Sequence, residues 1–171
     1  MRNHEALKRI ARRLGASPEP ALSGRGKGSR SERFGPGDEE IVSFERQHAI
    51  GLPDEYRSFL LELGMANTGL VPLSAAVPAG ASLARPFPFE RPSTLRPGGK
   101  RSKFEHVTLP PGTSVHDGCL YLVDRGCGSY DLLVVTGPQR GAVWASDCDD
   151  HIYPVGSSFL SYFEELLEED G

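Results

Sequence analysis

One cysteine, one histidine and two aspartates lie close enough in the sequence to suggest nucleophilic catalysis. Cys127 follows His116 and Asp117, and Asp131 comes shortly after it. A thiol nucleophile needs an adjacent imidazole to take its proton and a carboxylate to orient that imidazole. However, Cys127 stands between two glycines, and no oxyanion-hole motif surrounds it. We therefore interpret it as a structural turn cysteine and expect no enzyme and no catalytic residue, with a thiol-dependent hydrolase as the weaker alternative.

A second group of polar residues, Asp147 to His151, contains side chains that can bind metal ions. Its carboxylates could hold a hard cation. The group lacks the alternating oxygen positions and the glycine of a calcium loop. We predict an exposed acidic loop here, with no metal site and no cofactor. Because this loop follows Trp144, it offers an aromatic side chain beside charges, a combination typical of protein-binding surfaces. Packing of Trp144 in the core is an equal alternative.

Other functional classes find little support in the sequence. The three cysteines are an odd number without a CxxC pair, so neither a disulfide framework nor a zinc site is indicated. Gly24, Gly26 and Gly28 resemble a phosphate-binding run, but no apolar strand precedes them. No apolar stretch approaches the roughly 20 residues that cross a bilayer, and no signal peptide is evident. We expect a cytoplasmic protein without a membrane span.

The charge is unevenly distributed along the chain. Residues 1–37 hold nine Lys/Arg against three acids, whereas residues 38–171 hold ten against twenty. Six of those ten basic residues fall within 85–103, where Glu90 is the one acid, so the remaining surface is markedly acidic. An acidic surface disfavours nucleic acid and attracts basic partners over long range. We therefore expect a protein partner and no nucleic acid.

The N-terminal part divides into a basic helix and a linker. Residues 2–14 have apolar side chains at helical spacing with arginines between them, which predicts a short amphipathic helix. Residues 15–37 are rich in Gly, Ser, Pro and Arg, which is typical of a flexible linker. We place the domain boundary after residue 37 and interpret residues 1–37 as a solvated tail that is dispensable for folding.

The remainder, residues 38–171, has the pattern of one α+β domain. Two helices separated by a Gly-Leu-Pro elbow form a hairpin, and the proline-rich stretch 66–112 predicts short edge strands and loops. Three apolar segments joined by glycine-containing turns predict an antiparallel meander, at 119–124, 130–136 and 141–145. A final helix after Ser157 or Ser158 carries a broad apolar face. We expect this helix and the hairpin to pack against the sheet.

Two stretches resemble the SUKH superfamily, in particular its Smi/Knr branch. The first is residues 41–64, IVSFERQHAIGLPDEYRSFLLELG, which is similar to the opening signature of that branch. The second is residues 126–144, GCGSYDLLVVTGPQRGAVW, which is similar to a strand-turn-strand of bacterial members. The resemblance implies an α+β fold and, in bacteria, an immunity protein that neutralises a toxin domain of a polymorphic or contact-dependent system. Fungal relatives are regulatory interaction scaffolds, which is the alternative function; the resemblance does not identify the partner.

These observations together predict a partner-binding surface near the end of the meander. A toxin nuclease must hold a polyanion and tends to be basic, so an acidic surface suits it. The predicted contact residues combine aromatic anchors with a rim of carboxylates that is expected to tolerate charge reversal. They are Trp144, Asp147, Asp149, Asp150, Tyr130, Asp131 and Asp124.

Overall fold

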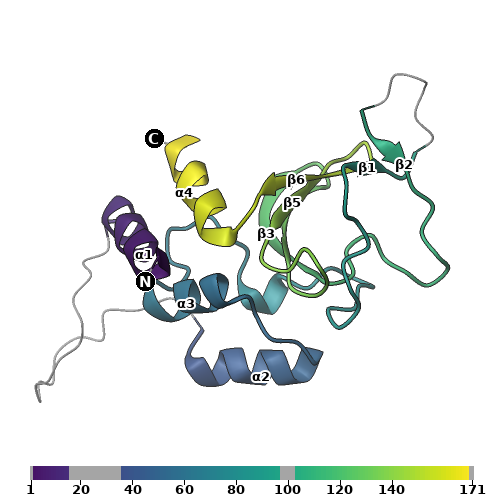
Figure 1. Ribbon diagram of the computed structural model, residues 1–171. Coiled ribbons are helices and arrows are strands. Elements are labelled where there is room, and N and C mark those ends of the chain that lie inside the picture. Colours follow the sequence, from purple (N-terminus) through teal and green to yellow (C-terminus); the bar gives the residue numbers. More distant parts are fainter. Residues whose placement is uncertain (1, 16–35, 97–102, 170–171) are drawn as a thin grey trace, which may run out of the picture.

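The computed structural model describes residues 2–15, 36–96 and 103–169 and confirms the predicted α+β fold. Within these ranges, helices gather on one side of a single six-stranded sheet (Figure 1). The sheet is antiparallel except where its two shortest strands meet in parallel. The elements, in chain order, are α1 (Arg2–Arg13), α2 (Asp38–His48), α3 (Asp54–Glu62), η1 (Leu73–Ala75), β1 (Ser93–Thr94), β2 (Glu105–His106), β3 (Cys119–Gly126), β4 (Ser129–Val134), β5 (Val143–Ser146), β6 (His151–Gly156) and α4 (Phe159–Glu169).

The predicted meander is present as β3, β4 and β5, and it continues into a fourth strand that the sequence analysis missed. The strands follow the order β2-β1-β6-β5-β4-β3 across the sheet. β6 contains Pro154 and ends at Gly156, two residue types that are depleted in strands, so its sequence does not indicate a strand. The expected short strands of 66–112 are also found, as β1 and β2.

Both faces of the sheet are covered, and β4 shows how the sequence achieves this. Successive strand residues point to opposite faces. Leu133 therefore joins the core formed with the helices, while Leu132 and Val134 join a second core. Residues of the proline-rich stretch, including Phe87 and Phe89, build that second core. Because both faces of the sheet are covered where β4 ends, the strand closes with three consecutive apolar residues, Leu132 to Val134.

An aromatic cluster joins the helix hairpin to the last helix. Phe159 of α4 meets Tyr56 and Phe59 of α3 with ring centroids 4.9 and 5.1 Å apart, both edge to face. Phe163 contacts Phe59 in the same way at 4.9 Å. Edge-to-face contacts of this kind are favourable beyond the area they bury. These four aromatic side chains are all buried, so the apolar face predicted for the last helix packs against the hairpin.

The basic N-terminal helix is present, but the interpretation of it as a solvated tail is wrong. In α1, Leu7 is 2 % exposed and Ile10 is fully buried. The helix packs against α3 and α4. Arg9 donates to both carboxylate oxygens of Glu164, at 2.7 and 3.1 Å. Four apolar side chains are enough to dock α1, because α3 and α4 together offer a surface on which they pack. Residues 16–35 of the predicted linker lie outside the described residues, so the boundary at residue 37 stays a prediction.

A buried carboxylate fastens the irregular stretch to the start of β3. Asp117 is fully buried and accepts hydrogen bonds from the backbone N–H groups of Ser82 and Ser114, at 2.7 and 3.0 Å. Next to it, Gly118 has φ +67°, and a Cβ there would lie 2.5 Å from the carbonyl oxygen of Arg85. A glycine is therefore required at this close approach. These contacts fix the stretch over the second face of the sheet.

Candidate functional site

The structure pairs His116, Asp117 and Asp131 with residues other than Cys127. Cys127 is exposed at φ +52° in the β3–β4 turn. The His116 ring instead lies edge to face with Tyr121 at 5.3 Å, and its Nδ1 is 3.4 Å from the Tyr121 hydroxyl. Burial lowers the pKa of His116. Asp117 is used by backbone N–H groups, and Asp131 is paired with an arginine of β3. The arrangement therefore lends no support to the hydrolase alternative.

The loop between β5 and β6 is organised from within by Asp147. Its Oδ1 accepts hydrogen bonds from the backbone N–H groups of Asp149 and His151, at 2.9 and 3.0 Å, and its Oδ2 lies 3.0 Å from His151 Nδ1. Partial burial raises the pKa of Asp147, but these hydrogen bonds and the His151 ring lower it, and the net pKa is below the ordinary value. Lysine at position 147 offers no acceptor for these hydrogen bonds, so charge reversal at Asp147 would alter the loop as well as its charge, and whether the fold tolerates it stays a prediction.

The other two acids of this loop face an arginine from the proline-rich stretch. Arg96 Nε lies 2.7 Å from Asp150 and its NH1 lies 3.8 Å from Asp149. The hydrogen bond to Asp150 raises the pKa of the Arg96 guanidinium. Asp149 and Asp150 still keep 69 % and 45 % of their side-chain surface exposed, so a partner can reach them. Screening by solvent keeps such exposed pairs weak, and a partner's cation can compete with Arg96.

Two of the predicted contact residues, Trp144 and Asp131, are buried. The prediction that a partner can reach them is therefore wrong. Trp144 is 1 % exposed and meets the Phe87 ring edge to face at 5.2 Å. Asp131 is 5 % exposed, accepts a 2.5 Å hydrogen bond from the Tyr162 hydroxyl and lies 2.6 Å from Arg125 NH2. Both results follow from sheet geometry, because each side chain points into one of the two covered faces. For Trp144 the structure therefore supports packing in the core, where it belongs to the second core.

A pair of tyrosines replaces Trp144 as the accessible aromatic group. Tyr130 stacks on Tyr121 with centroids 4.0 Å apart and planes 19° from parallel, and both rings are half-buried. Asp124 is the cross-strand partner of Tyr130, so their side chains share a face. Tyr121 was not among the contact residues predicted from the sequence. Alternation from Cys119 along β3 places Tyr121 on the face of Leu132 and Tyr130, and this signal could have found it.

The tyrosine pair and the carboxylates meet at one end of the sheet. β3 and β5 run in the same direction, so the turns that follow them lie at the same end. Tyr130 is paired with Ser146, the residue directly before Asp147. We call this region the acidic end. It consists of Asp124, Asp147, Asp149 and Asp150 with Tyr121 and Tyr130. Half-buried tyrosines within a charged rim are typical of residues that dominate protein–protein binding.

The fold defines an α+β domain in which helices cover one face of a mostly antiparallel sheet. The comparison with protein families makes this specific: the SMI1/KNR4 family (SUKH-1) matches residues 35–165. The chain belongs to this family. No curated protein and no solved structure gave a significant match. Among the described helices, none has the length and apolar character needed to cross a membrane.

Proposed function

We propose that this protein is an immunity protein that binds a toxin domain of a bacterial polymorphic or contact-dependent system and neutralises it. Membership of the SUKH-1 family supports this proposal. The chain would meet its toxin in the cytoplasm, where such a toxin acts. Neutralisation needs tight binding and no chemistry of its own, which agrees with the pairing of His116 with Tyr121 and of Asp131 with Arg125 rather than with Cys127.

The acidic end is the observation that carries the proposal. Asp124, the cross-strand partner of the half-buried Tyr130, is exposed, and so is Asp149 in the loop that follows β5. Carboxylates of this kind attract a basic partner over long range and raise its association rate, while a desolvated tyrosine supplies affinity. A nuclease toxin carries a basic surface for its polyanionic substrate, so these carboxylates would occupy the positions of phosphates.

The experiment is growth rescue by co-expression with the C-terminal toxin domain of a secreted protein encoded next to this chain. Expression of the chain should restore growth, and an inactivated toxin domain should co-purify with it. A toxin domain from an unrelated system is the control and should not be neutralised. Failure of both rescue and co-purification, or the absence of such a neighbour, would contradict the immunity role and favour a regulatory scaffold.

A further inference from the structure

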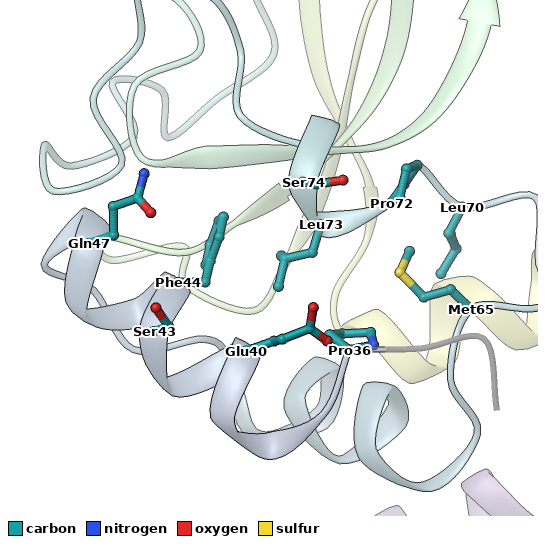
Figure 2. Close-up of a pocket in the computed structure, with 10 residues that line it drawn as sticks. All are labelled: Pro36, Glu40, Ser43, Phe44, Gln47, Met65, Leu70, Pro72, Leu73 and Ser74. Carbon is teal, nitrogen blue, oxygen red and sulfur yellow. The ribbon is translucent and has the colours of Figure 1, made fainter.

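A second surface feature lies between α2 and the segment that follows α3. It is a cavity of about 720 Å³, open to solvent. Figure 2 shows Phe44 of α2 and Leu73 of η1 pointing toward one another across it, with Met65 and Leu70 at one end. Glu40 and the other polar lining residues stand at the rim. We call this feature the α2 groove.

The walls of the α2 groove are held in place on both sides. On one side, Ile41 of α2 is fully buried, which anchors the helix while Phe44 remains half-buried. On the other side, Val71 N–H donates to the carbonyl of Leu122 at 2.7 Å, so this wall is tied to β3. A groove whose walls are fixed costs little to organise when a ligand enters.

The charge around the α2 groove favours a basic occupant. Glu40 is the one ionisable residue among its described lining residues, and no described cation lines it. Glu39 precedes Glu40 in the first turn of the helix, and so does Asp38, whose carboxylate is paired with Arg57 at 2.6 Å. An apolar floor with an acidic rim suits an apolar side chain flanked by Lys or Arg, because the side chain is desolvated while the cation stays near the carboxylate.

We propose that the α2 groove is a docking site for an apolar side chain of a basic protein partner. The inference rests on the proposed function in taking this partner to be the toxin domain. One member of the acidic end, Asp124, follows Leu122, which holds one wall of the groove, by two residues, roughly 7 Å along the strand. A standard interface covers about 800 Å² on each partner and can include both surfaces.

Two pairs of substitutions test the groove without disturbing the core. Gln47 and Ser74 are exposed residues at its rim, so Gln47→Trp and Ser74→Trp should obstruct it while the fold is retained. In the wild type the Glu40 carboxylate accepts a hydrogen bond from the backbone N–H of Gly37 at 2.9 Å. Glu40→Gln removes the charge but keeps an acceptor for this N–H. Glu39→Gln is the matched control, since it removes the same charge in the same turn outside the lining residues.

The first probe is a display library of random twelve-residue peptides, selected on the full-length chain. Selected peptides should combine an apolar residue with Lys or Arg, and Gln47→Trp should weaken their binding about tenfold. Glu40→Gln should weaken it more than Glu39→Gln. Selected peptides that bind the Gln47→Trp and Ser74→Trp variants as tightly as the wild type, or a selection that yields no binding peptide, would overturn the groove proposal.

The second probe is the toxin domain itself, and it separates this inference from the proposed function. Both tryptophan variants should bind the toxin domain about tenfold more weakly than the wild type. Wild-type affinity of both variants would remove the groove from the interface and leave the immunity role standing. If selected peptides bind the groove but the wild-type chain does not bind the toxin domain, the immunity role and the toxin as occupant both fail. The groove would then remain a docking site for another basic protein.

Discussion

Replacement of Ile10 by alanine tests whether α1 is part of the folded domain. Ile10 is fully buried where α1 packs on α3 and α4. Truncation of a buried isoleucine loses its transfer free energy and leaves a cavity, which costs about 2–5 kcal/mol. The exposed ion pair of Arg9 with Glu164 adds little to this, so apolar burial dominates the docking of α1. We therefore expect Ile10→Ala to lower the free energy of unfolding by at least about 2 kcal/mol.

The assay is urea unfolding of the full-length chain, with the free energy taken by linear extrapolation. Arg12→Ala is the control, because Arg12 is exposed on the same helix and alanine is the better helix former. It should change stability by no more than about 0.5 kcal/mol. A change equally small for Ile10→Ala would show that α1 does not dock and would restore the solvated-tail interpretation.

Three further predictions concern single side chains. Tyr162→Phe removes a hydrogen bond from the buried Asp131 and should lower the free energy of unfolding by about 1–3 kcal/mol in urea titration. The folded-state pKa of Asp147 is lowered, so its contribution to stability is lost as the pH falls below 3.8, and the free-energy cost of Asp147→Asn should shrink there. Ellman's reagent should modify two thiols of the native chain and spare Cys119, whose pKa burial raises.

Most elements could be predicted because their own sequence determines them. Helical spacing of apolar residues predicts α1 through α4, and apolar runs between glycines predict β3, β4 and β5. β6 was missed because Pro154 and Gly156 oppose strand propensity, and its pairing with β1 and β5 outweighs them. The docking of α1 was missed because its helical pattern does not reveal which surface receives it.

The site was predicted less well, because exposure depends on what covers each face. Alternation could place Trp144 on one face of the sheet, but the covering of that face by Phe87 and Phe89 depends on a stretch without periodicity. The same stretch brings Arg96 to the acidic loop from a distant part of the chain. The role of Asp147 within its own loop was also hidden, since Asx-type hydrogen bonds depend on local backbone geometry.

The most direct test of the account is the association rate with the toxin domain at low and high salt. The variant is the triple Asn substitution at Asp147, Asp149 and Asp150, which removes three charges, keeps the acceptor in the loop and suits the φ of +61° at Asp150. The control places three Gln substitutions at acids elsewhere. These are Glu62, Glu165 and Glu169, which are exposed.

The Asn variant should associate with the toxin domain about tenfold more slowly than the wild type at low salt, and high salt should largely remove the difference. The association rate of the control should stay within about twofold of the wild-type rate. The control has the same net charge as the Asn variant, but the charges it removes lie away from the acidic end. An unchanged rate and affinity in the Asn variant, or an equal loss in both variants, would contradict the claim that the acidic end binds the toxin.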